Sequence, residues 1–514
     1  MTDKHHPLLI ALPAFLALST TAAAQWSTPP AMPLTRYFHS AATGPDGQLY
    51  VIGGVIQGNP KPSGSVIRFD PATSQWSTAP AMNPRALHAA VTGCDGRIYV
   101  IGGYADPNTG TPGVTVQSYD PSSAAWQTEQ QSLPNSIPVS PTTKSVVATS
   151  GADCRIYAAD PSGDPVFSLD VFNKSAGWKQ EPAIGNGEEL FHMGAAHNGL
   201  LYAHGWSNYS FSSAWTDLSN TPYGATDYKG VSAPDNRVYV IGGLQPQAWR
   251  VDYPAITWGS TPQVATLRRD LAAAVADGRI YATGGRLAAS PPSAVAESWG
   301  PVRAATGPYL ARWRFNGSAG GTCASLKTTG TVAYPSGKVF NAVDLANGNL
   351  EAKGTLPCVN LDPSTGITIE FWINRGNLTG LQSILDKRSG NRGYHVFLYT
   401  SGGVTRVGIQ LANGTQAVNQ MSSIGLPANQ WVHIAIVVQQ ALNGASIWMN
   451  AVRVHQFTPI SGTFSNTAPL LIGAHSAGAQ NRYKGLLDEL TLYARPLNPV
   501  EIRSVFLAGS AGKI

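Results

Sequence analysis

A repeated stretch of strand-like sequence places the strongest constraint on how this chain can fold. It is clearest from Arg85 to Trp126, where a run of small residues leads to a polar turn and then to an apolar segment ending in Gly102-Gly103. The same pattern recurs at spacings of 37 to 58 residues, around Tyr50, Tyr99, Tyr157, Tyr202, Tyr239 and Tyr281. Apolar runs of period two separated by turn residues indicate strands, and a four-stranded unit repeated at this period predicts a propeller blade.

The composition agrees with a turn-rich all-β chain. The 514 residues include 54 glycines and 37 prolines, and 12% are charged, about half the usual share. The formal net charge is +5, and the chain has no basic run of the kind that follows phosphates, so we expect no nucleic-acid partner. The length allows two or three domains with cores of their own.

Residues 1–24 have the pattern of a signal peptide. Lys4 supplies a positive start, Leu8 to Leu18 an apolar centre, and Ala22-Ala23-Ala24 a small-residue cleavage site. Later apolar runs stay below 18 residues, so we expect no membrane insertion. The sequence therefore predicts a secreted or periplasmic protein that begins at Gln25, and we expect a monomer.

Each repeat divides into four strands, A to D, in which A carries small residues, B the tyrosine and glycine pair, and D a tryptophan. Small side chains suit the innermost strand because strands that converge on a propeller axis leave little room. The last repeat has no D strand after Ala294–Trp299, whereas Gln25–Met32 copies the D segment Gln75–Met82 with no blade before it. Because pairing removes both free edges, we predict that the N-terminal strand completes the last blade.

These features resemble the kelch repeat family, whose marks are the glycine pair, a tyrosine before it and a spaced tryptophan. Repeats 1, 2, 5 and 6 match well. Repeat 3 has Tyr157-Ala-Ala-Asp160 in place of the glycines, and repeat 4 keeps only Tyr202-Ala-His-Gly205. The resemblance implies a six-bladed kelch-type β-propeller over residues 25–303.

Basic side chains occupy equivalent positions at or near the start of strand A. These candidate ligand-binding residues are Arg36, His39, Arg85, His88, His192 and Arg269. Equivalent positions of a propeller form a ring at the channel mouth, which is a common ligand surface in kelch proteins. Two interpretations stay open: the arginines pair with carbonyls or carboxylates of the ring itself, or these residues meet an acidic ligand. No nucleophile and base occur at a recognisable spacing, so no catalytic residue is assigned.

A second domain follows a short linker at residues 304–308. Longer alternating strands replace the repeat, for example Ile367–Ile373 and Val404–Leu411, which suggests a two-sheet sandwich. The segments Trp431–Ala435 and Gly485–Tyr493, the latter followed by a short helix entering at Asn498-Pro499, resemble the laminin-G-like, concanavalin-like jelly roll. The resemblance implies such a domain over residues 309–510.

Four cysteines in an exported chain permit three pairings. Cys323 and Cys358 lie in one region, 35 residues apart, so we pair them. Cys94 and Cys154 lie near corresponding turns of successive repeats, where they form either a bridge between blades or two free thiols.

Laminin-G-like domains usually bind glycans or proteins, some of them through calcium. Asp344 and Asp488 are candidate calcium ligands because hard oxygens suit that ion. The alternative is that the acidic pair at Asp488 is structural. No other cofactor is predicted.

Two functions are consistent with this organisation. The first is a non-catalytic recognition protein that binds carbohydrate or a cell-surface or extracellular protein. The second is a carbohydrate-active enzyme, of the sugar isomerase, lyase or oxidase type, with its site at the propeller mouth and the second domain as a binding module. Function resides in particular sites, so the fold alone does not decide between them.

Overall fold

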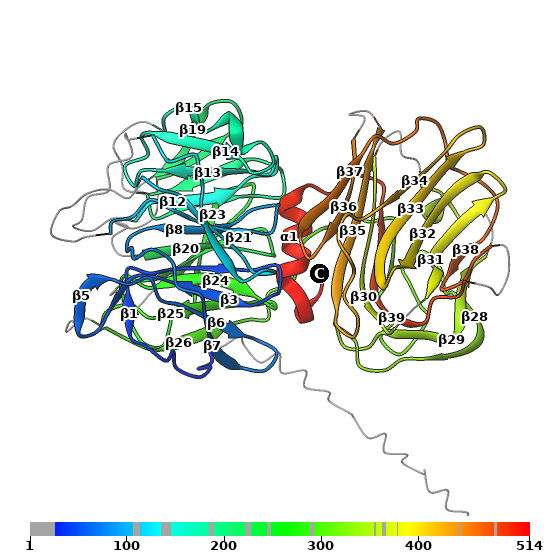
Figure 1. Ribbon diagram of the computed structural model, residues 1–514, viewed down its shortest axis with the longest axis horizontal. Coiled ribbons are helices and arrows are strands. Elements are labelled where there is room, and N and C mark those ends of the chain that lie inside the picture. The colour runs from blue at the N-terminus through cyan, green and yellow to red at the C-terminus, as the bar shows by residue number, and fades with distance from the viewer. Residues whose placement is uncertain are drawn as a thin grey trace, which may run out of the picture.

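The computed structural model describes residues 26–514 apart from 106–113, 135–144, 185–189, 206, 221–227, 244–247, 288–291, 354–355, 362–365, 378, 441–443 and 477–480. The predicted signal peptide lies outside these residues. These described residues are all-β apart from one α-helix and a few single 3₁₀ turns. Its two parts are called the ring, up to Trp299, and the sandwich, from Ala311 onward (Figure 1). No helix within the described ranges is long and apolar enough to cross a bilayer.

The ring consists of small antiparallel sheets, each formed by consecutive strands. In the first half these strands are β2 (Ser40–Thr43), β3 (Leu49–Ile52), β6 (Val66–Asp70), β7 (Gln75–Ala79); β8 (Ala89–Thr92), β9 (Ile98–Ile101), β10 (Gln117–Asp120), β11 (Ala125–Thr128); β12 (Val147–Ser150), β13 (Arg155–Ala159), β14 (Val166–Asp170) and β15 (Lys179–Glu181). In the second half they are β16 (His192–Ala195), β17 (Leu201–His204), β18 (Ser207–Phe211), β19 (Trp215–Asn220); β20 (Tyr228–Ala233), β21 (Arg237–Gly242), β22 (Ala248–Asp252), β23 (Thr257–Thr261); β24 (Ala272–Ala276), β25 (Arg279–Thr283) and β26 (Ala296–Trp299). A small side sheet comprises β1 (Arg36–Tyr37), β4 (Val55–Ile56) and β5 (Asn59–Pro62).

The first strands of successive sheets contact one another in a closed cycle, β2, β8, β12, β16, β20, β24 and back to β2. These are the strands predicted to be innermost from their alanines, glycines and threonines. The sheet of β24, β25 and β26 has only three strands of its own, and the N-terminal segment completes it. Ser27 exchanges both backbone hydrogen bonds with Ser298, each 2.8 Å long, and Met32 N–H donates to the carbonyl of Ala294 at 2.9 Å. The predicted closure of the ring by the N-terminal strand is therefore confirmed.

The repeated tryptophans link neighbouring sheets. The indole N–H of Trp76 donates to the carbonyl of Pro30, and that of Trp126 to the carbonyl of Pro80, each on the preceding sheet. Trp26 makes the same bond to Pro262, at 2.9 Å. The closing strand thus repeats the packing of the fourth strands that carry Trp76 and Trp126.

The sandwich is one continuous antiparallel sheet that folds over its own core. Its strands are β27 (Ala311–Trp313), β28 (Lys327–Ala333), β29 (Val343–Ala352), β30 (Ile367–Arg375), β31 (Gly380–Ser389), β32 (Arg392–Ser401), β33 (Val404–Asn413), β34 (Ala417–Met421), β35 (Val432–Gln439), β36 (Gly444–Met449), β37 (Val452–Phe457), β38 (Leu470–Ile472) and β39 (Gly485–Tyr493). Along the sheet they run in the order β34, β33, β32, β31, β38, β29, β39, β30, β35, β36, β37. Fully buried side chains such as Trp313, Phe371 and Ile434 fill the interior.

Helix α1 (Pro499–Ala508) joins the two parts, and lies between them as the red helix of Figure 1. Asn498 begins it with a capping box, in which the Asn498 side chain accepts from Glu501 N–H and the Glu501 carboxylate accepts from Asn498 N–H. This pairing satisfies amides that a helix start otherwise leaves unbonded. The helix then meets the ring, where Gly278 N–H donates to the carbonyl of Leu507 at 2.7 Å.

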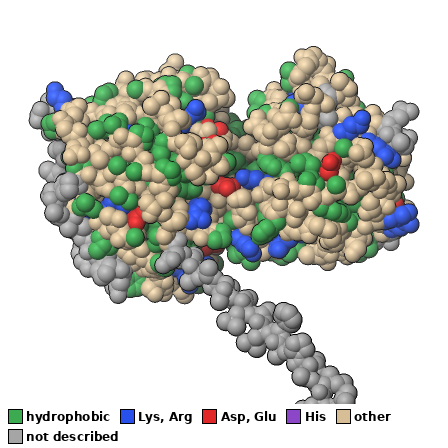
Figure 2. Space-filling model, turned by 90° about the horizontal axis from the view of Figure 1, so that it is seen from below, with side chains coloured by type: hydrophobic (Ala, Val, Ile, Leu, Met, Phe, Trp, Pro, Cys, Tyr) green, Lys and Arg blue, Asp and Glu red, His purple; other side chains and the backbone are tan. Residues whose placement is uncertain are grey.

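Polar contacts also tie the ring to the sandwich. Lys338 forms an ion pair of 2.7 Å with Asp277, and Arg453 N–H donates to the carbonyl of Cys94 at 2.8 Å. Acidic and basic side chains lie side by side where the two parts meet, whereas the rest of this face carries scattered charges (Figure 2). The segment expected to be a linker is packed: Ala304 is buried and bridges to Lys513.

Two disulfides are present. Cys94 is bonded to Cys154 of the next sheet, with Cα atoms 5.5 Å apart, so of the two alternatives for this pair the structure has the bridge. Cys323 is bonded to Cys358, with Cα atoms 6.2 Å apart, as the sequence prediction pairs them.

Candidate functional site

The structure places Arg36 and Arg85 inside the ring. Their side chains are buried, and both use Nη1 to bond carbonyls of their own repeat: Arg36 bonds Gly53 and Arg85 bonds Gly102, each at 3.1 Å. Burial lowers the pKa of each guanidinium to about 10, so both remain cationic at neutral pH. These contacts agree with the first of the two interpretations, in which the arginines pair with carbonyls of the ring itself. A ligand role for either residue stays a prediction.

His39 and His88 lie between sheets. His39 Nε2 is 3.1 Å from Thr283 Oγ1 of the last sheet, and the His88 ring packs against Gly53 of the preceding sheet. Gly53 has φ of +62°, and a Cβ there would lie 2.8 Å from His88 Cε1, so only glycine fits. Burial lowers the pKa of His39 well below its usual value, and that of His88 to about 3. Both imidazoles are therefore uncharged at physiological pH, and they fill space between neighbouring sheets.

The structure changes one assignment. Arg36 and Arg85 each precede the first residue of strand A by four positions, and in the last sheet that position belongs to Arg268 rather than Arg269. Arg268 is fully buried and pairs with Glu297 at 2.8 Å. The choice of Arg269 as the equivalent of Arg36 was therefore wrong by one residue, because Arg268-Arg269 offers two arginines and only the packed register distinguishes them.

His192 lies at the start of β16, where its Nε2 is 3.0 Å from Ser232 Oγ on the next sheet. Burial lowers its pKa well below the usual value. The predicted residues thus occupy separate positions around the ring, each engaged with its own or the neighbouring repeat.

A row of polar side chains crosses the outer face of the sandwich. Direct cross-strand partners from β31 to β34 bring together Asp386, His395, Gln410 and Asn419. Directly opposed residues on antiparallel strands point to the same face, and the hydrophobic core takes the alternate residues Tyr394, Val396, Ile409 and Leu411. At about 4.8 Å per strand, the row spans roughly 14 Å.

Arg388 connects this row to the loop after β38. It donates to both carboxylate oxygens of Asp386, from Nε at 2.8 Å and from Nη2 at 2.7 Å, and also to Gln410 Oε1. Its Nη2 is 2.9 Å from His475 Nε2. The fork geometry of guanidinium and carboxylate makes this a strong, directional pair. The cluster formed by Asp386, Arg388, His395, Gln410, Asn419 and His475 is called the polar row below.

The protonation states of the polar row follow from burial and from Arg388. Burial raises the pKa of Asp386, but hydrogen bonds from Arg388 and Ser476 outweigh it and hold that pKa below its usual value. Burial, together with the charge of Arg388, lowers the pKa of His395 to about 3. At neutral pH the row therefore combines the carboxylate of Asp386, paired with Arg388, with the neutral imidazole of His395 and two amides. Together these groups offer hydrogen-bond donors and acceptors, and their charges cancel.

Asp386, His395 and His475 also form the one group among the described residues whose ligand atoms, all within 4.8 Å of one another, could hold a metal ion. Arg388 already occupies both oxygens of Asp386, so a metal ion would have to displace the guanidinium. The predicted calcium ligands lie elsewhere. Asp344 Oδ1 accepts from Ala346 N–H, and Asp488 Oδ2 accepts from Val339 N–H at 2.8 Å. Calcium binding by these two residues stays a prediction.

Little in the sequence pointed to the polar row. Its members are spread over the 90 residues from Asp386 to His475, and single histidines and amides in strands carry no motif. The register of three hairpins brings them together. Alternation of polar and apolar residues along β32 and β33 was the one available signal.

Comparison with protein families agrees with both parts of the chain. The Kelch motif matches residues 36–83 and 85–130, and the Concanavalin A-like lectin/glucanases superfamily, in its Laminin_G_3 form, matches residues 347–503. No curated protein matches the chain.

Solved structures show distant likeness to each part or to the whole. Domain 4 of an extracellular arabinanase from Geobacillus stearothermophilus, solved with arabinotriose, is 19% identical over 39% of this chain and 98% of that one, with a TM-score of 0.33. The binding domain of Paraclostridial Mosquitocidal Protein 1 is 18% identical over 35% of this chain and 47% of that one, with a TM-score of 0.31. A fungal alcohol oxidase of the AA5 family, solved with copper, is 13% identical over 82% of this chain and 85% of that one, with a TM-score of 0.40.

Proposed function

We propose that this chain, which joins kelch motifs to a laminin-G-like, concanavalin-like domain, is an exported recognition protein that binds carbohydrate through the polar row of the sandwich. Kelch and lectin-like domains both suit ligand binding. The observation that carries the proposal is the convergence of a carboxylate, a guanidinium, imidazoles and amides on one face of four neighbouring strands.

The chemistry of the row suits sugar hydroxyls, which donate and accept hydrogen bonds in equal measure. Gln410 receives Arg388 on its Oε1, while its amide nitrogen donates to no described residue. The Asn419 side chain is exposed at the end of the row. Amides with free donors and acceptors placed at fixed spacing select a ligand by its hydroxyl pattern.

Aromatic side chains flank the row on β32. Phe397 follows His395 by two residues on the same face, with ring centroids 5.1 Å apart, and its ring packs over Gly408 of β33. Tyr399 continues the same face and is 42% exposed. Aromatic faces pack against the C–H face of a sugar ring while polar neighbours bond its hydroxyls. A row of roughly 14 Å suits a short oligosaccharide rather than a single sugar.

The pairing of Asp386 with Arg388 favours a neutral glycan. The carboxylate and the guanidinium neutralise each other, and a charged ligand would have to break a bidentate pair. Ser383 Oγ lies 2.9 Å from His395 Nε2, but both side chains are buried, and the lowered pKa of His395, about 3, makes it a weak base. Recognition without reaction is proposed because this pair is out of reach of a ligand and because Arg388 holds the pKa of Asp386 below its usual value.

The test is a glycan-array screen of the mature chain, followed by calorimetry on each hit and analysis of the solution for products. Asn419→Ala and Gln410→Ala should weaken binding by about tenfold each, equal to roughly 1.4 kcal/mol. Asn347→Ala is the matched control, because Asn347 is an exposed amide on β29 away from the row. Equal affinity of all three variants would place the glycan site elsewhere, and conversion of a hit to product would establish an enzyme instead.

A further inference from the structure

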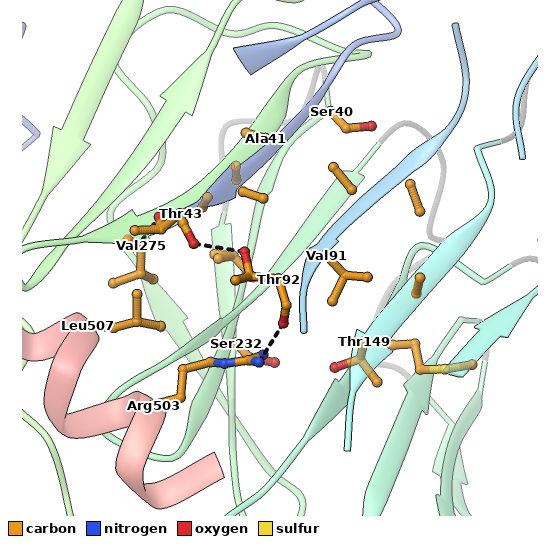
Figure 3. Close-up of a pocket in the computed structure, with 18 of the residues that line it drawn as sticks. Ser40, Ala41, Thr43, Val91, Thr92, Thr149, Ser232, Val275, Arg503 and Leu507 are labelled. Carbon is orange, nitrogen blue, oxygen red and sulfur yellow. Dashed lines mark hydrogen bonds between the residues drawn. The ribbon is translucent and has the colours of Figure 1, made fainter. Parts of the chain in front are cut away.

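The channel of the ring encloses a cavity of about 200 Å³. Its wall is formed by the first strands of the sheets, and α1 of the sandwich covers one end, with Arg503 and Leu507 facing it (Figure 3). A water molecule occupies roughly 30 Å³ in the liquid, so the cavity is large enough for a small organic ligand. The site therefore requires both parts of the chain.

Two cations line this cavity. Arg503 enters from α1, and Lys229 from the start of β20. Among the described residues that line the cavity there is no aspartate and no glutamate. Lys229 lies three residues before Ser232 on β20, about 10 Å at 3.3 Å per residue, and Ser232 lies at the level of Arg503 (Figure 3). The cations therefore approach the cavity at different depths.

Neither cation is neutralised by the protein. Within the described residues, the Lys229 ammonium has no hydrogen bond and no ion pair, although the backbone of Lys229 pairs with β21, and the Arg503 guanidinium uses only Nη2, which donates to the carbonyl of Thr92. Burial lowers the pKa of Lys229, and lowers that of Arg503 to about 10. Both side chains are partly buried. A partly desolvated positive charge without a partner destabilises the folded state, and an anion in the cavity would offset that cost.

Hydroxyl groups also line the cavity wall. Thr43 Oγ1 donates to the carbonyl of Val275 at 2.6 Å, and Thr92 Oγ1 donates to the carbonyl of Thr43 at 2.8 Å, each across a boundary between sheets. Thr149 and Ser232 face the same cavity (Figure 3). Each bonded hydroxyl keeps acceptor lone pairs, so the wall can receive hydrogen bonds from a hydroxylated ligand.

We propose that this cavity is a binding site for a small hydroxylated oxyanion, of sugar-acid or sugar-phosphate chemistry, with Lys229 and Arg503 as its cationic contacts. The cavity lies in the ring, away from the polar row, and the proposal does not depend on carbohydrate binding there. Charge-assisted hydrogen bonds from an ammonium and a guanidinium to a carboxylate or phosphate are the strongest class of polar contact that the cavity offers. The hydroxyl wall supplies selectivity.

The experiment is calorimetry on the mature full-length chain with three probes that share one sugar: galacturonate, galactose 1-phosphate and galactose. At least one of the two anions should bind, and galactose should not; which anion binds better separates the carboxylate from the phosphate ligand. Lys229→Met should weaken that binding by about tenfold, whereas Lys327→Met, on exposed β28, should leave it unchanged. Asn419→Ala should also leave it unchanged, which separates this site from the polar row.

A second measurement needs no ligand. Because no described residue pairs with the Lys229 ammonium, Lys229→Met should unfold at a higher temperature than the parent chain when no anion is added, and saturating anion should close that gap by stabilising the parent alone. Equal binding of galactose and galacturonate, retained affinity in Lys229→Met, or no binding of either anion at millimolar concentration would overturn the proposal. So would a lower unfolding temperature of Lys229→Met.

Discussion

Asp488 provides a direct test of how burial controls charge in this protein. The residue is fully buried on β39, and its Oδ2 accepts from Val339 N–H, while Oδ1 bonds no described residue. The neighbouring cations pair with other carboxylates: Arg312 pairs with Glu489 at 2.7 Å, and Lys513 pairs with Glu370. Burial, with the charge of Glu489 in addition, raises the pKa of Asp488 to about 8.

The sign of the resulting pH dependence follows from linkage. Between about pH 4 and pH 8 the folded chain keeps a proton on Asp488 that the unfolded chain has lost. The stabilisation linked to this group is therefore complete below the unfolded pKa and is lost as the pH rises through 8. Each pH unit costs up to about 1.4 kcal/mol, so at pH 7 the group has lost roughly 4 kcal/mol relative to pH 4.

The perturbation is Asp488→Asn, which keeps the shape and removes the titration. The free energy of unfolding from denaturant titrations at pH 5, 6, 7 and 8 should favour the variant increasingly, by about 1.4 kcal/mol per pH unit. Lys327→Met, an exposed change on β28, should follow the parent curve. A difference that is constant with pH would show that Asp488 is already ionised in the folded protein, and the argument from burial would fail.

The same samples test the calcium prediction. If Asp344 and Asp488 bind calcium, the ion will hold Asp488 ionised, and millimolar calcium will stabilise the parent at pH 8 without stabilising Asp488→Asn. If calcium has the same effect on both chains, Asp488 is a structural residue. The readout is the unfolding midpoint with calcium and with chelator.

Two further predictions concern the ring. Arg268→Met should destabilise the chain by about 3–5 kcal/mol because it leaves Glu297 buried without its partner, whereas Arg269→Met, at the half-exposed neighbour, should cost clearly less; equal losses in thermal unfolding would contradict the corrected register. Ser27→Pro removes the N–H that bonds Ser298 at the closure and should cost about 1–3 kcal/mol, measured by denaturant unfolding; an unchanged midpoint would mean that this strand contributes nothing to closing the ring.

Much of the fold was accessible from the sequence because its signals are local. Alternation predicted strands at Ile367–Ile373 and Val404–Leu411, which are observed as β30 and β33 with the same starts, and Asn498-Pro499 marked the start of α1. The ring closure was also accessible, because Gln25–Met32 duplicates a fourth strand whose partner is missing elsewhere. A duplicated segment retains the packing of its copies, and Trp26 indeed bonds Pro262 as Trp76 bonds Pro30.

The candidate sites were accessible only in part. The sequence identified the arginines and histidines of strand A, but whether a guanidinium faces ligand or its own carbonyls depends on which way the side chain turns in the packed ring. Arg268 and Arg269 illustrate the limit: they are adjacent and identical in chemistry, but Arg268 is fully buried and Arg269 is partly exposed. Packing against Glu297, 29 residues farther along, decides between them.

By itself, then, the amino-acid order determined which segments become strands, how many residues separate the turns, and which terminal segment completes the ring, because each of these depends on neighbours within a few residues or on a repeated copy. Tertiary structure alone decided the rest. Cross-strand register assembled the polar row from Asp386 to His475, and the docking of α1 against the ring brought Arg503 into the cavity that Lys229 also lines. Contacts between residues so distant in sequence arise only when whole sheets have packed.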